Sequence, residues 1–260
     1  MRAIIIGAGR GRRLMPATAG SPKCFAEVQG KRILDWGLAA LSAAGIRDIC
    51  FIGGYQIDKV RAEYPHLAFR HNHDWPHNNI LVSLMHAEDL MNGPFLCAYS
   101  DILFTASLVK GLLSHPADIA LSVDTLWLER YRYRTDHPPD DAEKVTAING
   151  RVTRVHRGID PREAHGEYTG LAKFSQTGAA LLKEHYHRCR AAHAGKAFRE
   201  AAVFEKAYLI HLFQEMIEAG VPMAHADSPG EYLEIDTQQD FELAQLHWKG
   251  SPRTAVPKPE

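Results

Sequence analysis

The chain has 260 residues, of which 45% are hydrophobic and 23% charged, a balance typical of globular proteins. Its 30 lysines and arginines against 31 acidic residues leave a formal net charge of −1, which excludes the basic surplus of most nucleic-acid-binding proteins. No stretch approaches the roughly 20 apolar residues of a membrane span, and no cysteine pair has CxxC spacing. These features predict a cytoplasmic protein without a membrane or nucleic-acid partner.

The first half of the chain alternates between short apolar runs and stretches of helical periodicity. Apolar runs without polar positions are typical of strands that are buried on both faces of a parallel sheet. Strands are predicted over residues 2–6, 48–53, 68–70, 95–99 and 117–124, and helices over residues 33–44, 60–64 and 79–91. This alternation predicts an α/β fold with a doubly wound, mostly parallel sheet.

The second half has shorter strand patterns, over residues 144–149, 152–156, 171–175, 221–226 and 232–235, and helical patterns over residues 177–193, 205–219 and 240–247. Because the patterns are mixed, we interpret this half as a small lid-like β extension of the same sheet. Residues 1–250 then form a single domain, with the lid and acceptor part at about 125–175, and the proline-rich residues 251–260 form a flexible tail. An apolar helix in this half is compatible with a homodimer.

The strongest local pattern is Gly7-Ala8-Gly9-Arg10-Gly11-Arg12-Arg13-Leu14, followed by Pro22-Lys23. Glycines directly after a buried strand let the backbone approach an anion, so that N–H groups point at phosphate oxygens. The basic side chains supply the positive charge that a triphosphate needs. A dinucleotide site would need GxGxxG at the start of a helix, and a Walker loop would need GxxxxGK followed by Ser or Thr. Neither spacing is present, and the basic residues argue against a plain tight turn.

This pattern resembles the signature of the sugar-nucleotidyltransferase superfamily, with Arg13 and Lys23 at the signature positions. The resemblance implies a Rossmann-like mixed α/β domain with a smaller lid-like sheet, and a loop that wraps a nucleotide triphosphate. On this basis we predict Lys23, Arg13 and Asp101 as catalytic residues. The predicted nucleotide-binding residues are Gly7, Ala8, Gly9, Gly11, Arg12, Gly54, Tyr55, Asn79, Ser83 and Ser100.

Two aspartates follow predicted strands, Asp101 after the run 95–99 and Asp236 after the run 232–235. An acid at the carboxyl end of a parallel strand faces the crevice where ligands bind, and two carboxylates that share one cation suit Mg²⁺. Taken alone, each aspartate fits a turn or a helix cap equally well. The superfamily places its metal aspartates at matching positions, which implies a Mg²⁺ site formed by Asp101 and Asp236.

Segments 78–84, 140–145 and 166–171 resemble a narrower branch, the cytidylyltransferases that act on phosphocholine and 2-aminoethylphosphonate. A small cationic acceptor suits carboxylates and aromatic rings, because cations favour aromatic faces. We predict an acceptor site formed by Trp127, Tyr131, Lys144, Glu167 and Tyr168. Trp127 and Tyr131 have helical spacing and fit core packing as well, and Lys144 also fits an exposed surface position.

The sequence thus predicts a Mg²⁺-dependent cytidylyltransferase that joins CMP, from CTP, to a small phosphorylated or phosphonylated alcohol or amine. Two alternatives stay open. One is a sugar-1-phosphate nucleotidyltransferase that uses UTP, dTTP or GTP, and the other is a regulatory relative that binds nucleotide without chemistry. A zinc site at His73 and His77 is disfavoured, because Pro76 interrupts the helix that their spacing would need.

Overall fold

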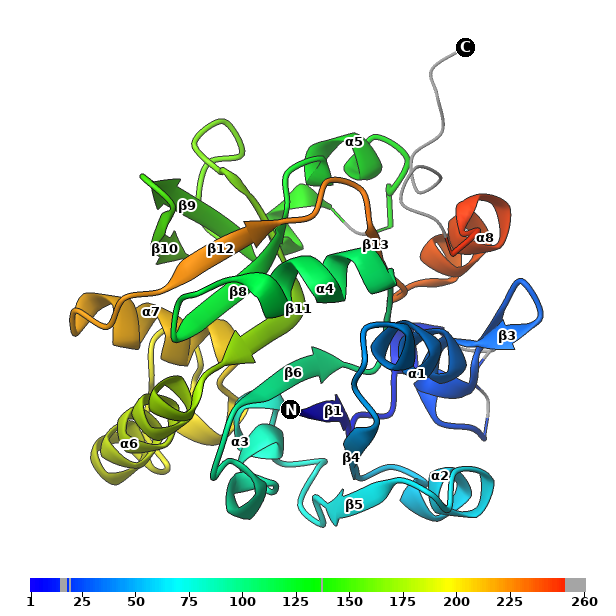
Figure 1. Cartoon of the computed structure of the whole chain (residues 1–260), viewed down its shortest axis with the longest axis horizontal. Coiled ribbons are helices and arrows are strands. Elements are labelled where there is room, and N and C mark those ends of the chain that lie inside the picture. The colour runs from blue at the N-terminus through cyan, green and yellow to red at the C-terminus, as the bar shows by residue number, and fades with distance from the viewer. Residues whose placement is uncertain (15–17, 19, 137, 251–260) are drawn as a thin grey trace.

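A nine-stranded mixed sheet runs through the middle of the molecule (Figure 1), in the order β5-β4-β1-β6-β11-β8-β12-β10-β9. The structure is a computed structural model that describes residues 1–14, 18, 20–136 and 138–250, so the predicted tail at 251–260 lies outside the described residues. The strands of the sheet are β1 (Arg2–Gly7), β4 (Asp48–Gly53), β5 (Ala68–His71), β6 (Phe95–Tyr99), β8 (Ile119–Asp124), β9 (Lys144–Ile148), β10 (Arg151–Val155), β11 (Gly166–Phe174) and β12 (Ala224–Asp227).

Most strands of the sheet run in one direction. The pairings among β5, β4, β1 and β6 are parallel, as is the pairing of β8 with β12. β11 lies between β6 and β8 and is antiparallel to both, and β10 is antiparallel to β12 and β9. The mostly parallel α/β fold predicted from the sequence is therefore confirmed. The reversal of β11 places its first residues at the edge where β6 and β8 end.

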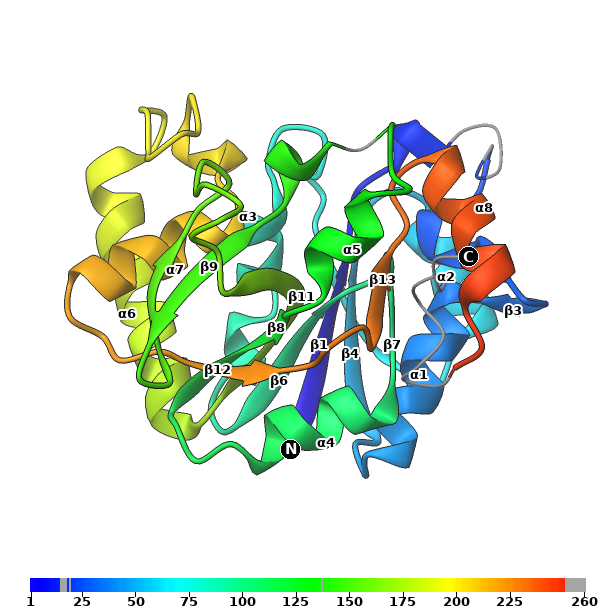
Figure 2. The same ribbon diagram turned by 90° about the horizontal axis from the view of Figure 1, so that it is seen from above.

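Helices cover both faces of the sheet and produce three layers (Figure 2). One face carries α1 (Ile33–Ala43), α2 (Ile57–Glu63) and α4 (Ala106–Ser114), and the other carries α3 (Ile80–Met85), α6 (Gln176–His193) and α7 (Leu209–Glu218). Successive strand residues point to opposite faces. In β1, Ala3 and Ile5 therefore pack into the core beneath α1, α2 and α4. Ile4 and Ile6 pack into the core on the opposite face, beneath α3, α6 and α7.

The last described helix, α8 (Gln238–His247), does not pack on the sheet. It packs against the segment that follows β1. Its Trp248 end joins Leu14 and Ile235 in a separate apolar cluster. The helix begins with a capping box, in which the Thr237 side chain accepts from the Asp240 N–H and the Asp240 side chain accepts from the Thr237 N–H. Through this packing the C-terminal part of the chain returns to the glycine loop.

Short elements complete the described chain. Two ribbons pair β2 (Glu27–Val28) with β3 (Lys31–Arg32), and β7 (Ile102–Phe104) with β13 (Tyr232–Glu234). The remaining turns of helix are α5 (Trp127–Tyr131), η1 (Arg12–Leu14), η2 (Lys23–Phe25), η3 (Glu88–Leu90), η4 (Pro139–Asp141) and η5 (Phe204–Lys206). The sequence prediction missed α4 and β7, and the helix predicted over 79–91 is divided into α3 and η3.

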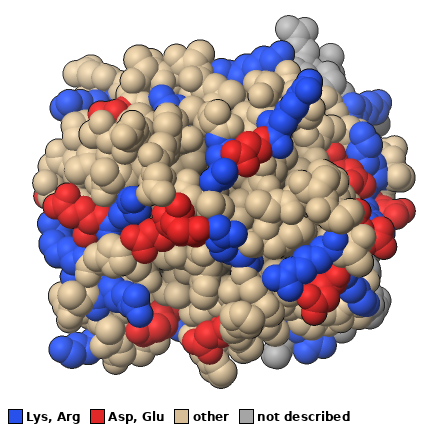
Figure 3. All heavy atoms as spheres, turned by 60° about the horizontal axis from the view of Figure 1, so that its bottom comes forward, with Lys and Arg blue, Asp and Glu red and all other residues tan. Residues whose placement is uncertain are grey.

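Charged side chains of both signs are interspersed on the face shown in Figure 3, in line with the nearly balanced composition. Among the helices of the described residues, none combines the length and the apolar character needed to cross a bilayer.

Candidate active site

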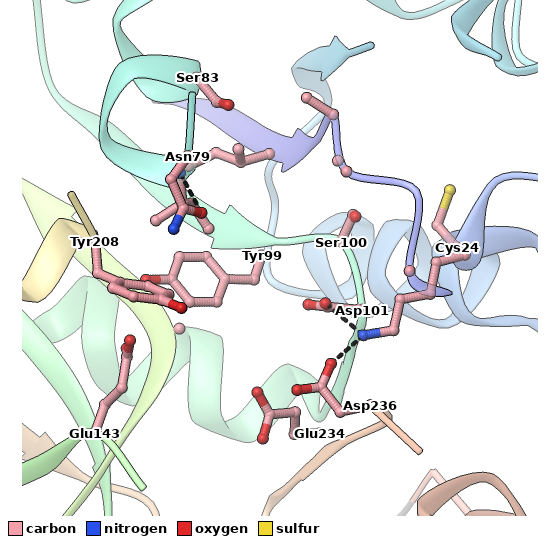
Figure 4. A pocket seen from close by; sticks show the side chains of 18 of the residues that line it. Cys24, Asn79, Ser83, Tyr99, Ser100, Asp101, Glu143, Tyr208, Glu234 and Asp236 are labelled. Carbon is pink, nitrogen blue, oxygen red and sulfur yellow. Dashed lines mark hydrogen bonds and ion pairs between the residues drawn. The ribbon is translucent and has the colours of Figure 1, made fainter. Parts of the chain in front are cut away.

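A cavity of about 630 Å³ lies at the edge of the sheet where β1 and β6 end and β11 begins. In open α/β sheets this edge is where ligands bind. Both halves of the chain contribute side chains that point into the cavity, among them Asp101, Glu143, Tyr208 and Asp236 (Figure 4).

The loop after β1 lines one wall, through Gly7, Ala8, Gly9 and Gly11. A Cβ on Gly7 would lie 2.5 Å from the Phe51 ring, so no larger residue fits there. Gly11 has a φ of +64°, a conformation that L side chains rarely adopt, and a Cβ there would lie 2.8 Å from the side chain of Lys23. The glycines therefore let the backbone line the cavity and let Lys23 pass close beside it.

Lys23 is buried, and its ammonium lies between two carboxylates. Its Nζ donates to Asp101 Oδ2 at 2.8 Å and to Asp236 Oδ1, the two interactions drawn as dashed lines to these aspartates in Figure 4. Burial acts to lower the pKa of Lys23, but the two carboxylates outweigh burial and raise it. The side chain is therefore a buried cation that stays charged at neutral pH.

The ribbon of β7 and β13 brings the two aspartates together. Asp101 directly precedes β7, and Asp236 follows β13 after Ile235, whose N–H donates to the carbonyl of Asp101 at 3.1 Å. Thr237, and not Asp236, caps α8, so the Asp236 carboxylate is directed to the cavity. The predicted convergence of Lys23, Asp101 and Asp236 is present in the structure.

Further charges surround this group. Arg13 donates from Nη2 to Asp236 Oδ2 at 2.5 Å, and its Nη1 lies 3.9 Å from Asp141 Oδ2. Glu234 also lines the cavity, and its pKa is raised well above its usual range by burial and then by Asp236, while Arg134 opposes the shift. The crowded carboxylates make this part of the cavity attractive to a cation. The prediction for the Arg12 side chain lies outside the described side chains.

The predicted residues on and near α3 line the cavity but are already hydrogen-bonded. Asn79 Oδ1 accepts from the N–H of Ile80, and Asn79 Nδ2 donates to the Lys206 carbonyl. Ser83 Oγ accepts from Asn72 Nδ2 at 2.9 Å. Asn79 and Ser83 thus hold the shape of this wall.

Ser100 and the pair Gly54-Tyr55 take different places. Ser100 lines the cavity directly after β6. Neither Gly54 nor Tyr55 is among the described residues of the cavity wall. They lie behind the glycine loop, where the N–H of Tyr55 donates to the carbonyl of Ala8 at 2.9 Å. Their observed contact supports the loop.

The wall away from the glycine loop contains residues that the sequence prediction missed. Arg157 lies with Nη2 at 3.5 Å from Glu143 Oε1, and its guanidinium stands 4.1 Å from the centre of the Tyr208 ring. Burial raises the pKa of Glu143 to about 7, although Arg157 acts against the rise. The buried hydroxyl of Tyr168 has no hydrogen-bond partner within the described residues. The wall therefore offers an acid, a guanidinium, an aromatic ring and a hydroxyl.

The sequence indicates some residues of this wall better than others. Glu143 falls within segment 140–145, which resembles the cytidylyltransferase branch, but no local pattern marks Arg157 or Tyr208. Arg157 follows β10 and Tyr208 precedes α7, and these elements become neighbours only in the folded chain.

The structure corrects three of the predicted acceptor residues. Trp127, Tyr131 and Lys144 are buried and lie outside the described lining of the cavity. Trp127 and Tyr131 pack on each other, as the core-packing alternative required. Lys144 is directed away, because its Nζ donates to the carbonyl of Pro139 at 2.9 Å.

Glu167 and Tyr168 do line the cavity. Glu167 accepts from Arg130 Nη2 at 2.5 Å and from the Tyr131 hydroxyl at 2.8 Å, so its charge is balanced from within the protein. Glu143 is the acid of this wall that is better placed to meet an acceptor.

Comparison with known proteins gives consistent matches. The model of the MobA-like NTP transferase domain matches residues 3–138. A CTP:phosphoglutamine cytidylyltransferase of Campylobacter jejuni is 28% identical over 94% of this chain and 98% of its own length. A UTP–glucose-1-phosphate uridylyltransferase of Haloferax volcanii is 30% identical over 67% of this chain and 72% of its own. The solved structure of the inositol-1-phosphate CTP transferase from T. maritima has a TM-score of 0.72 at 21% identity and covers 94% of each chain, so it shares the fold.

Proposed function

The chain belongs to the MobA-like NTP transferase family, and on this premise we propose that it transfers CMP from CTP to the phosphate or phosphonate of a small acceptor. One observation carries the proposal. A single cavity combines the glycine loop and Lys23 on one side with Glu143 and Arg157 on the other. Such a cavity suits a triphosphate beside a small charged molecule. Cytosine is favoured because the relative that spans 94% of the chain and the solved structure both use CTP.

The residues of the chain supply position and charge for a single displacement. The N–H groups of the glycine loop, with Lys23 and Arg13, would hold the triphosphate. An acceptor oxygen forms a bond to the α-phosphorus, while the bond from that phosphorus to the bridging oxygen breaks and pyrophosphate leaves. The acceptor oxygen is already ionised at neutral pH, so no side chain needs to take up a proton. Catalysis then depends on orientation and electrostatic stabilisation.

We further propose that Asp101 and Asp236 hold Mg²⁺. Carboxylate oxygens are the ligands that Mg²⁺ prefers, and the crowding that raises the pKa of Glu234 favours a cation beside it. When bound, the ion would neutralise charge at the α-phosphate. In the structure described here Lys23 balances both aspartates, which supports the view that this position is built for positive charge.

For the acceptor we propose a small molecule with a phosphate or phosphonate at one end and an ammonium or amide group at the other. Glu143 can accept hydrogen bonds from such a group, and the ring of Tyr208 offers a face to a cation. The partnerless hydroxyl of Tyr168 supplies a further polar contact. Phosphocholine, 2-aminoethylphosphonate and a phosphorylated amide all have this chemistry.

The test measures pyrophosphate release from each nucleoside triphosphate with a panel of phosphorylated acceptors, with and without Mg²⁺. Release is expected with CTP, Mg²⁺ and an amino or amido acceptor. Glu143→Gln should raise KM for the acceptor and leave KM for CTP unchanged, whereas the exposed Glu163→Gln should change neither.

Other results would overturn the assignment. Release only with UTP and a sugar 1-phosphate would favour the uridylyltransferase chemistry of the Haloferax volcanii relative. CTP binding without release for any acceptor would favour a regulatory protein.

A further inference from the structure

Two histidines and one aspartate form a cluster outside the cavity. His165 directly precedes β11, and His225 and Asp227 lie on β12. Residues i and i+2 of a strand share one face, so His225 and Asp227 point to the same side. One ligand atom from each of the three residues lies within 4.8 Å of the others, and within the part of the chain that the structure describes this is the only such trio of His, Cys, Asp or Glu.

The contacts of the cluster meet at one oxygen. His165 Nε2 and His225 Nδ1 each lie 2.8 Å from Asp227 Oδ1, and the two rings are 4.3 Å apart between centres. The His225 side chain is 12% exposed and the Asp227 side chain 43%, so the cluster is open to solvent on one side. Three potential ligand atoms therefore surround one point that an ion can reach.

We propose that His165, His225 and Asp227 bind a divalent transition-metal ion of the Zn²⁺ class. Two imidazole nitrogens and a carboxylate oxygen are ordinary zinc ligands, whereas Mg²⁺ selects oxygen. The two nitrogens that now face Asp227 would turn lone pairs to the ion, and each imidazole would carry its hydrogen on the other nitrogen. Water from the exposed side would complete the coordination.

The site would fasten together two segments that lead to the cavity. His165 lies two residues before Glu167 in the cavity wall, and β12 leads on to β13 and Asp236. An ion shared by these segments would tie the loop before β11 to a strand of the central sheet. The expected effect is stabilisation, and the site requires no part in the reaction.

The experiment uses the full chain with excess Mg²⁺ to occupy the carboxylates of the cavity. Zn²⁺ binding is measured by calorimetry, Co²⁺ binding by visible absorption, and Tm by thermal unfolding. His165→Gln and His225→Gln should each bind Zn²⁺ at least about tenfold more weakly than the parent, and only the parent should show a higher Tm with Zn²⁺. His187→Gln is the matched control, because His187 also pairs with a carboxylate, Glu88 at 2.6 Å, but is not part of the trio. It should bind as the parent does.

The outcomes divide clearly. Equal affinity in the parent and both histidine variants, or no Zn²⁺ binding by the parent, would overturn the site. An equal loss of Zn²⁺ affinity in His187→Gln would assign the binding to surface histidines in general, and it would also overturn the proposed site. If a histidine variant unfolds, Asp227→Asn replaces it, since the amide oxygen still accepts from both imidazoles while the anionic ligand is lost.

Discussion

Lys23→Met removes a cation that lies directly between Asp101 and Asp236, while it keeps an unbranched side chain of similar length. Deleting one partner of a buried ion pair costs about 3–5 kcal/mol, because the remaining charge is left uncompensated. The Asp236 side chain is 11% exposed and the Asp101 side chain 29%. Solvent therefore screens part of the loss, and Arg13 still pairs with Asp236, so we expect a decrease of about 2–3 kcal/mol in the free energy of unfolding.

This loss corresponds to a fall in Tm of about 4–12 °C for a chain of this size. Thermal unfolding in EDTA measures it. Mg²⁺ should raise the Tm of the variant more than that of the parent, because the variant lacks the ammonium that lies between the two aspartates. The pKa of Lys23 is raised, so its contribution to the free energy of unfolding is fully present below the usual lysine pKa of about 10.5. This contribution is lost only as the pH rises through the higher pKa of the folded state. The comparison is therefore insensitive to pH near neutrality.

If the proposed function holds, activity should fall by at least about 10²-fold, because a triphosphate bound at the glycine loop would lose a buried positive charge. The matched control is Lys173→Met. Lys173 is as buried as Lys23, but its Nζ donates to the carbonyls of His115 and Ala117 at 2.6 and 2.8 Å, outside the described lining of the cavity. Lys173→Met should lose stability and keep its kcat/KM. A Lys23→Met protein with the stability or the activity of the parent would refute this reasoning.

Three further predictions concern single contacts. The pKa of Glu143 is raised from 4.5 to about 7, so the folded state holds this proton more tightly and the free energy of unfolding should decrease as the pH rises through this interval. Urea titrations at several pH values should show a smaller decrease in Glu143→Gln than in the parent, and an equal decrease in both would contradict this. Gly11→Ala places a methyl group against the side chain of Lys23 and should abolish turnover. Gly30→Ala has the same sign of φ but open space around it, so it should only lose stability. Equal kcat values in the two variants would contradict this. Thr237→Ala and Thr105→Ala each remove a helix cap at a cost of about 1 kcal/mol, or about 2–4 °C in Tm, and only the first, which adjoins a cavity aspartate, should also lower kcat.

The sequence places the glycine loop and Asp101 at the cavity for a physical reason, although Gly54 and Tyr55 lie behind the loop. The glycine loop and Asp101 each follow an apolar run, and the ends of parallel strands meet at one edge. A residue that directly follows such a strand is therefore placed by local pattern alone. Asp236 also follows an apolar run, but it reaches Asp101 through the antiparallel pairing of β13 with β7, which the argument from parallel strands does not cover.

The acceptor side is less predictable, because its contacts join distant parts of the chain. Trp127 and Tyr131 have the composition of an aromatic binding site, yet their spacing reflects packing within α5. Asp240 has the sequence position of a solvated acid in a first helical turn. In the structure it is buried, because Arg134 donates to it at 2.7 Å from a segment that no local pattern connects with α8.

The reversed direction of β11 has a consequence for how such a domain can diversify. The glycine loop is anchored on β1 and β6, whereas Glu167 and Tyr168 enter the cavity from the beginning of β11. Substitutions in that strand can thus alter this wall of the cavity while the anchorage of the glycine loop is preserved. A domain with this layout separates a loop that is fixed by parallel strands from a wall that is set by β11, so one can change without rebuilding the other.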